Sequence, residues 1–352
     1  MRQRNSRVRL GLIPLFLFSL TLWSQDTAPP QAPPRSSQPA PSQPSSETPA
    51  PAPATKGQEP GVEPGGFVFH SEVQEVSLHA TVIDDKQRII TDLDRNAFTV
   101  FEDGKPQVIK SFRHEDIPIS LGIVIDNSGS MREKRARVVK AAINLVRASN
   151  PNDEVFVVNF SDEYFLDQPF TNKINLLQTA LEKYETRGGT ALYDAIVASA
   201  EELKKHGKLQ KNILFVVTDG EDDASRESLE QAVRRLQEEN GPTVYAIGLL
   251  GEERQRRAKR ALETIAERTG GIAFFPRTLD EVDAISSTVA RDIRNQYTIA
   301  YTPTNTAMDG TFRQIKIMVR APGNPTVRTR TGYYATPDQA APSGAAGKVT
   351  SK

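Results

Sequence analysis

Three oxygen-bearing side chains stand at alternate positions of one short turn in the sequence: Asp126, Ser128 and Ser130. Gly129, between the two serines, lets the backbone fold tightly enough to bring the three side chains into a shared space. Carboxylate and hydroxyl oxygens are the ligands that hard cations such as Mg²⁺ prefer. The turn therefore indicates a metal site, although the plainer alternative is that Ser128 or Ser130 caps a helix that begins near Met131.

The segment before this turn predicts where it lies in the fold. Residues 119–125 form a continuous apolar run rich in Ile and Val, and a helical pattern follows the turn. Such a run is typical of a parallel strand that is buried on both faces. Ligands bind at the carboxyl ends of strands in open α/β sheets, so the turn stands where a binding site is expected.

Two further polar clusters could join the turn at the same edge of the sheet. One is the loop 186–190 (Thr-Arg-Gly-Gly-Thr), and the other is Thr-Asp-Gly at 218–220, directly after the apolar run 213–217. If that run is a strand beside the first, Asp219 and Asp126 end about 5 Å apart and repel unless a positive charge lies between them. Taken separately, Thr190 could simply cap a helix and Asp219 could form an Asx turn. Taken together, the clusters predict a metal site with the ligands Asp126, Ser128, Ser130, Thr190 and Asp219.

This set of five residues resembles the metal-ion-dependent adhesion site (MIDAS) of von Willebrand factor type A domains, and every position of that motif is filled. The resemblance covers residues 117–293. It implies that Ser128, Ser130 and Thr190 bind Mg²⁺ or Mn²⁺ directly, whereas Asp126 and Asp219 act largely through water. Hydroxyl ligands leave the divalent charge only partly neutralised, so the expected partner is a protein that supplies a Glu or Asp carboxylate. In the family, ligation is coupled to a shift of the last helix, here residues 279–293.

Two other functions stay open on the sequence. A Mg²⁺-dependent hydrolase would use an aspartate nucleophile with a second carboxylate two residues later, but here that position is Ser128. A serine hydrolase would need Gly-x-Ser-x-Gly, and the first glycine is missing. The second alternative is a metal-independent scaffold of an envelope complex. We expect a binding protein of the adhesion type and not an enzyme.

An acidic run, Glu-Asp-Asp at residues 221–223, follows the predicted metal ligand Asp219. It could recruit a second cation such as Ca²⁺, but no ring of ligands at the spacing of a calcium loop follows it. We therefore expect a solvated acidic loop.

Residues 117–294 alternate strand and helix patterns, which predicts a Rossmann-like, doubly wound and mostly parallel α/β sheet. The expected strands are 119–126, 154–160, 212–218, 243–249 and 272–275. One expected helix comes directly after the turn that carries Ser128 and Ser130, and the others are 174–184, 191–206, 226–239, 254–268 and 279–293.

The flanking segments 67–115 and 295–335 have the alternating pattern of antiparallel strands. We expect them to pack together as one small β-sandwich that flanks the α/β domain, with two separate β-elements as the alternative. The dipeptides Asp103-Gly104 and Asp309-Gly310 are hairpin signals. We expect the second to join strands 296–302 and 312–320. These flanks also resemble, more loosely, secreted bacterial proteins built around this domain.

The two ends of the 352-residue chain have a different composition. Residues 1–24 carry four arginines followed by a short apolar stretch, which is typical of a secretory signal, with an uncleaved membrane anchor as the alternative. Residues 25–66 are rich in Pro, Ala and Ser and predict a disordered linker, and residues 336–352 predict a similar tail. We therefore expect an exported protein in the periplasm, in the cell envelope or outside the cell.

Composition excludes several function classes. The chain has no cysteine, so disulfides, thiol catalysis and cysteine-based zinc sites are impossible. The formal net charge is zero, so no bulk electrostatic attraction to nucleic acid or to an anionic membrane follows.

Overall fold

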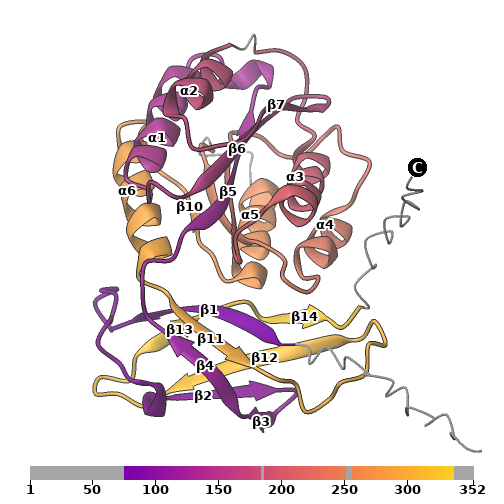
Figure 1. Ribbon diagram of the computed structural model, residues 1–352. Coiled ribbons are helices and arrows are strands. Elements are labelled where there is room, and N and C mark those ends of the chain that lie inside the picture. Colours follow the sequence, from indigo (N-terminus) through magenta and orange to yellow (C-terminus); the bar gives the residue numbers. More distant parts are fainter. Residues whose placement is uncertain (1–74, 184–185, 251–255, 337–352) are drawn as a thin grey trace, which may run out of the picture. The chain divides into compact units, whose positions relative to one another are not determined.

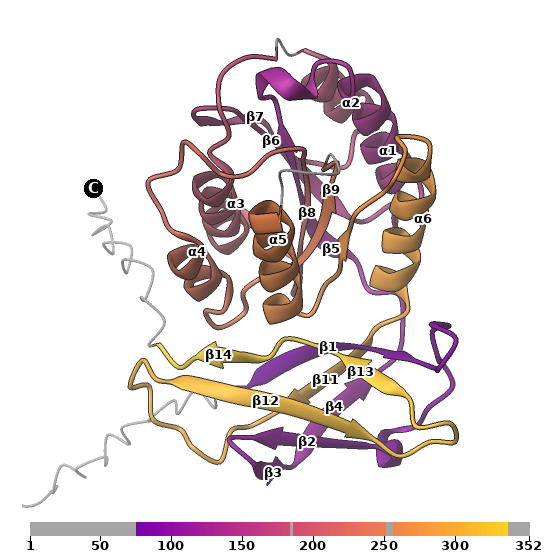
Figure 2. The ribbon, with the colours of Figure 1, turned by 180° about the vertical axis from the view of Figure 1, so that it is seen from behind.

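A computed structural model of the chain describes residues 75–183, 186–250 and 256–336. The predicted signal segment, the Pro-rich linker and the C-terminal tail beyond residue 336 lie outside the described residues. Across the described ranges, no helix is both long enough and apolar enough to cross a membrane. The described part contains one six-stranded sheet flanked by helices and two four-stranded antiparallel sheets (Figures 1 and 2).

The six-stranded sheet has the order β10-β9-β8-β5-β6-β7. Five of its strands are parallel, and β7 at one edge runs antiparallel to β6. The central strand β5 is buried along its whole length, as its apolar run predicts. The bounds are β5 Ile119–Asp126, β6 Glu154–Phe160, β7 Tyr164–Thr171, β8 Lys211–Thr218, β9 Thr243–Gly248 and β10 Ala273–Phe274.

Helices cover both faces of this sheet (Figures 1 and 2). On one face lie α1 (Arg135–Arg147), α2 (Ile174–Glu182) and α6 (Glu281–Arg294); on the other lie α3 (Leu192–His206), α4 (Leu229–Leu236) and α5 (Arg256–Thr269). The predicted doubly wound α/β class, with flanking antiparallel sheets, is confirmed.

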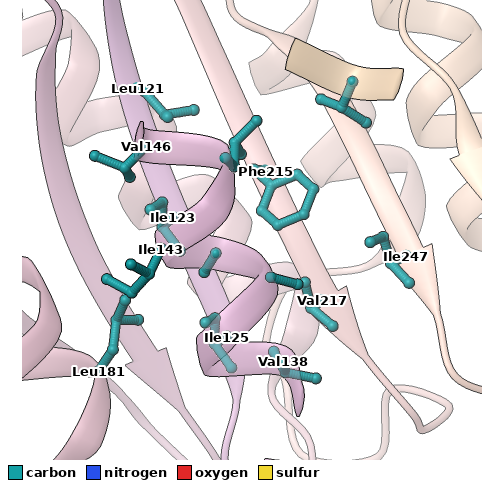
Figure 3. Close-up of a cluster of buried hydrophobic side chains, with 14 of the residues drawn as sticks. Leu121, Ile123, Ile125, Val138, Ile143, Val146, Leu181, Phe215, Val217 and Ile247 are labelled. Carbon is teal, nitrogen blue, oxygen red and sulfur yellow. The ribbon is translucent and has the colours of Figure 1, made fainter. Parts of the chain in front are cut away.

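Each face of the sheet has its own apolar core because side chains alternate along a strand. Ile123 and Ile125 of β5 pack on the side of α1, together with Phe215 of β8 (Figure 3). Val124 points to the opposite core, with α3 and α5. Gly122 is required at its position, since a Cβ atom there would lie 2.4 Å from the Phe156 ring. The core thus fixes β5, whose last residue is the first predicted metal ligand.

The remaining strands form two four-stranded antiparallel sheets, with the orders β13-β1-β11-β4 and β14-β12-β2-β3. Each sheet combines strands that precede the α/β segment with strands that follow it. Leu78, Val100, Ile299 and Ile317 meet in one shared apolar core. The bounds are β1 Val76–Ile83, β2 Phe98–Glu102, β3 Lys105–Gln107, β4 Ile109–Arg113, β11 Tyr297–Tyr301, β12 Phe312–Val319, β13 Thr326–Arg328 and β14 Gly332–Tyr334, with a 3-10 turn at Arg95–Ala97.

One predicted hairpin is wrong. Asp309-Gly310 does not pair β11 with β12, because these strands belong to different sheets. The Asp309 carboxylate accepts hydrogen bonds from the Thr311 amide and hydroxyl, and the Gly310 amide donates to the Ala335 carbonyl at 2.7 Å. The dipeptide fixes the local turn but not the strands that it connects. Asp103-Gly104, by contrast, joins β2 to β3 with positive φ at both residues, as predicted.

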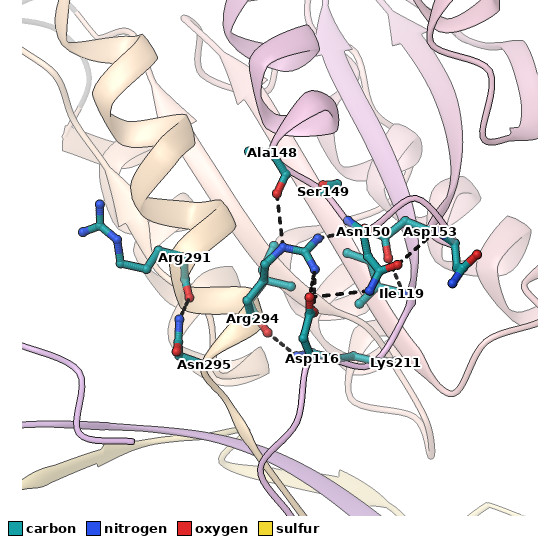
Figure 4. A network of polar contacts seen from close by, with 12 residues as sticks. Asp116, Ile119, Ala148, Ser149, Asn150, Asp153, Lys211, Arg291, Arg294 and Asn295 are labelled. Atoms are coloured by element: carbon teal, nitrogen blue, oxygen red, sulfur yellow. Dashed lines mark hydrogen bonds and ion pairs between the residues drawn. The ribbon is translucent and has the colours of Figure 1, made fainter. Parts of the chain in front are cut away.

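The end of α6 is held by polar contacts with neighbouring elements (Figure 4). Arg294 donates to the Asp116 carboxylate, to the Asp153 carboxylate at 3.1 Å and to the Ala148 carbonyl at 3.2 Å. The buried ammonium of Lys211 donates to the Ile293 carbonyl. The last turn of α6 is thereby fixed to the start of β5 and β8, just before the chain enters β11.

Candidate metal centre

The neighbouring strands β5 and β8 place two of the predicted ligands at one edge of the sheet. The strands are parallel, with Ile125 opposite Val217, so Asp126 ends one strand and Asp219 follows the other. After β5 the chain makes a 3-10 turn at Gly129–Met131, which contains Ser130 and is preceded directly by Ser128. The parallel register therefore brings residues 93 positions apart into the same site.

Four of the five predicted ligands form one chain of hydrogen bonds. The Ser128 amide donates to Asp126 Oδ1 at 2.7 Å, and the Ser128 and Ser130 hydroxyls share a hydrogen bond at 3.2 Å. Ser130 Oγ donates to Asp219 Oδ1 at 2.7 Å. Among the described residues, neither serine side chain caps α1, which begins only after Lys134. The capping alternative is thus not what the structure shows.

Thr190 reaches the site from a separate loop. Its side chain is 4% exposed, and its hydroxyl lies against Gly220, where a Cβ atom would be 3.0 Å from Thr190 Oγ1. Gly220 directly follows Asp219, so Thr190 lies beside that ligand. The Gly129 amide donates to the Gly188 carbonyl at 3.3 Å and ties the two loops together.

Three acidic side chains that sequence reasoning did not assign hold the Thr190 loop. Asp162 Oδ1 accepts the Gly189 amide and Asp223 Oδ1 accepts the Thr190 amide, both at 2.7 Å. Asp222 accepts the Tyr193 amide at the start of α3 at 3.2 Å. The expectation of a merely solvated acidic loop was therefore incomplete. The sequence carried only part of the signal for these contacts: a Gly-Gly loop exposes amides that need acceptors, but the carboxylates that accept the Gly189 and Thr190 amides are 27 and 33 residues away along the chain.

The site concentrates negative charge away from water. The Asp126 side chain is fully buried and Asp219 is 2% exposed. Burial raises the pKa of Asp126, the neighbouring Asp219 charge adds to the rise, and hydrogen bonds from Thr218 and Ser128 oppose it. Such a pair of carboxylates favours a cation.

The chain supplies one cation itself. The ammonium of Lys134 forms an ion pair with Asp219 Oδ2. Lys134 was missed in the sequence, although its spacing of four residues from Ser130 places both on one side of a helical turn. This ammonium shows that positive charge is stabilised at the carboxylate where the motif would bind a metal.

The residues present suit a hard divalent cation. All five side chains offer oxygen, and Ser130 is exposed whereas the other four are buried, which gives the site an outward face. In the described part of the chain, no group of three or more His, Cys, Asp or Glu side chains could hold a metal. An ion at this site would therefore depend on hydroxyl ligands and would keep more of its positive charge than in a carboxylate cage.

Comparison with known proteins assigns the domain. Residues 121–221 match the family described as the von Willebrand factor type A domain, and the matched segment includes all five predicted ligands. The central part of the chain is therefore a von Willebrand factor type A domain, as the motif implied. An uncharacterized protein of Synechocystis sp. is 26% identical over 110 residues, or 30% of this chain and 26% of that protein. The chain thus spans about a quarter of the length of this curated relative.

Several solved structures are similar at low sequence identity. An aerotolerance-related membrane protein from Bacteroides fragilis NCTC 9343 is 19% identical, with a TM-score of 0.41 over 50% of this chain and 98% of that chain. BatB from Bacteroides thetaiotaomicron is 20% identical, with a TM-score of 0.39 over 49% of this chain and 98% of that chain. Proximal thread matrix protein 1 from the mussel byssus, in a structure with a zinc-occupied MIDAS motif, is 17% identical, with a TM-score of 0.45 over 55% of this chain and 50% of that chain.

Proposed function

We propose that this chain is an exported, metal-dependent protein-binding protein whose site is formed by Asp126, Ser128, Ser130, Thr190 and Asp219. The observation that carries the proposal is the hydrogen-bonded chain from Asp126 through both serines to Asp219, with the Lys134 ammonium against that last carboxylate. Two buried carboxylates and three hydroxyls at one strand edge form an oxygen-rich site for Mg²⁺ or Mn²⁺.

The same ligand set defines the chemistry of the partner. The bound ion supplies a positive charge that hydroxyl ligands do not cancel, and the exposed Ser130 marks the side from which a further ligand approaches. A Glu or Asp carboxylate of a partner protein is the natural group there, since it is anionic and directional. Ser128 stands where a phosphoryl-transfer enzyme would carry its second carboxylate, which favours binding over catalysis.

The test is metal binding by the full chain, measured by calorimetric titration with Mg²⁺ and with Mn²⁺. We expect Ser130→Ala to weaken the affinity roughly 10- to 100-fold, the range found when groups that support a metal are lost. Ser287→Ala, on the exposed face of α6, is the matched control and should bind as the unmodified chain does. Equal Mg²⁺ affinities for the Ser130→Ala and Ser287→Ala variants would contradict the proposed metal site.

Partner binding needs its own measurement. A library of random displayed peptides is selected on the immobilised full chain in Mg²⁺ buffer and eluted with EDTA. We expect the EDTA-eluted pool to be enriched in peptides with Glu or Asp, and the Ser130→Ala chain to yield no such pool. Binding that EDTA does not release would favour the metal-independent scaffold.

A further inference from the structure

A cavity of about 310 Å³ lies beside the candidate metal centre, on the β6 side of the loop that follows β5. Its wall includes Asn127, which stands between the predicted ligands Asp126 and Ser128, and Phe165 of the edge strand β7. Its volume is at the lower end of the range for ligand pockets, so it can hold a short part of a ligand. The von Willebrand motif assigns no role to the position of Asn127.

Asn127 is the unusual residue of this cavity. Its side chain is 2% exposed, yet neither Oδ1 nor Nδ2 has a hydrogen-bond partner among the described residues. The backbone of the same residue is satisfied, since its amide donates to the Phe160 carbonyl at 2.6 Å and its carbonyl accepts the Arg187 amide at 2.9 Å. A buried carboxamide without partners is rare and costly, so it needs a specific explanation.

The unpaired atoms define the group that would satisfy them. Asn127 offers one acceptor and two donor hydrogens in a fixed plane. A carboxylate brings only acceptors and an ammonium brings only donors, whereas an extended peptide backbone presents the N–H and the C=O of one residue on the same side. The backbone N–H and C=O of one peptide residue are therefore the complementary groups.

The surroundings of the cavity suit an apolar neighbour of that peptide group. Three consecutive large side chains of β7 are exposed: Tyr164 and Phe165 at 48% each and Leu166 at 43%. Exposed apolar clusters of this kind mark interaction surfaces. Lys183 and Arg187, whose side chains are exposed, also line the cavity.

We propose that this cavity is a second recognition subsite for the same partner, in which Asn127 binds the backbone N–H and C=O of one peptide residue and Phe165 packs against an apolar side chain next to it. The inference rests on the proposed function, because the same partner segment places its carboxylate on the metal. Asn127 precedes Ser128 directly, and an extended residue spans about 3.3–3.6 Å. We therefore expect the peptide residue bound by Asn127 to lie one or two residues from the acidic residue.

The experiment repeats the peptide selection with three full chains: the unmodified chain, Asn127→Leu and Phe165→Ser. In the unmodified chain we expect EDTA-eluted peptides with an acidic residue and an aromatic or aliphatic residue at a fixed short spacing. The Asn127→Leu and Phe165→Ser chains should still select acidic, EDTA-eluted peptides but should lose the fixed apolar position. A consensus peptide from the first pool should bind the variants about tenfold more weakly or worse, the ratio that corresponds to ~1.4 kcal/mol.

A chemical variant of the consensus peptide tests the hydrogen bond itself. Replacing the predicted amide by an ester removes its N–H donor, which should weaken binding to the unmodified chain several-fold and leave binding to Asn127→Leu unchanged. Asn127→Leu should also raise the melting temperature of the metal-free chain, since it removes an unpaired buried amide. A lowered melting temperature would show a structural role for Asn127 and overturn the proposal.

The outcomes separate the two proposals. If no chain yields an EDTA-eluted acidic pool, the proposed function fails. If all three chains yield such a pool with the same apolar preference and the ester weakens binding equally in each, the metal-dependent function stands and the Asn127 subsite is overturned.

Discussion

The proposed divalent cation would compete with Lys134 for one carboxylate, that of Asp219. The lysine ammonium contacts Asp219 Oδ2, while Ser130 donates to Oδ1. The Lys134 side chain is 30% exposed, so its ammonium can move toward solvent when a metal binds. The residue thus stabilises the buried Asp219 carboxylate and would oppose binding of the proposed metal.

Lys134→Met should therefore act in opposite directions on metal affinity and on metal-free stability. One positive charge about 5 Å from a divalent ion costs roughly 1–2 kcal/mol in water-like surroundings. We expect Mg²⁺ to bind about tenfold more tightly to the variant and the metal-free chain to melt at a lower temperature, as measured by titration calorimetry and thermal unfolding. Lys140→Met, which removes an exposed lysine paired with Asp283, should change neither property. Weaker Mg²⁺ binding in Lys134→Met would show that the lysine supports the metal instead.

At the scale of elements, β8 and α6 meet through one buried charge. Lys211 at the start of β8 is 3% exposed and donates to the Ile293 carbonyl near the end of α6. Burial lowers the pKa of Lys211 from 10.5 to about 8, while the nearby Asp292 and Asp116 carboxylates limit the decrease. The protonated lysine is thus less favourable in the folded chain than in the unfolded one.

This shift predicts a pH dependence of stability. Between about pH 8 and pH 10.5 the unfolded chain holds the Lys211 proton more tightly than the folded chain, so folded stability rises with pH across this window. The unfolding free energy of the unmodified chain, relative to Lys211→Met, should rise by roughly 3 kcal/mol from pH 7 to pH 10.5. Urea denaturation at several pH values measures this difference. A difference independent of pH would contradict the prediction.

At the scale of the whole described molecule, α6 joins the von Willebrand domain to the strands that follow it. Asp292 of α6 accepts hydrogen bonds from Tyr245 of β9 and from Arg328 of β13, a strand of the antiparallel sheets. Gln296, at the junction, donates to the Tyr245 hydroxyl at 3.2 Å. These contacts hold α6 in place, so a shift of this helix on ligation would have to break them.

Arg328→Met should therefore destabilise the molecule. Asp292 is 2% exposed and would stay buried with one partner fewer. Because Arg328 is partly exposed, we expect the free energy of unfolding to fall by about 2–3 kcal/mol, somewhat less than for a fully buried pair. Urea denaturation measures the loss. Arg137→Met removes the exposed ion pair between α1 and Asp280 and should change stability by less than about 0.5 kcal/mol. Comparable losses in the two variants would show that the contact between Asp292 and Arg328 does not anchor α6.

The sequence by itself determined the parallel sheet and the spacing of the five candidate ligands. Buried parallel strands such as β5 and β8 can be recognised in the sequence as continuous apolar runs. Three of the five candidate ligands, Asp126, Ser128 and Ser130, lie within one turn. Strand β7 was not predicted, since its exposed Tyr164–Leu166 segment lacks the alternation of a half-buried strand. A local sequence pattern therefore predicts a strand or helix only where its side chains are buried continuously or at a regular spacing.

Only the tertiary structure decided which groups meet. The Asp309-Gly310 turn fixes local backbone angles, but pairing between distant strands places β12 in a sheet apart from β11. The same holds for Lys134 against Asp219, for Asp223 on the Thr190 amide and for the Asn127 side chain, which finds no hydrogen-bond partner among the described residues. These contacts depend on the order and register of strands, which arise from the burial of the whole core and not from any single segment.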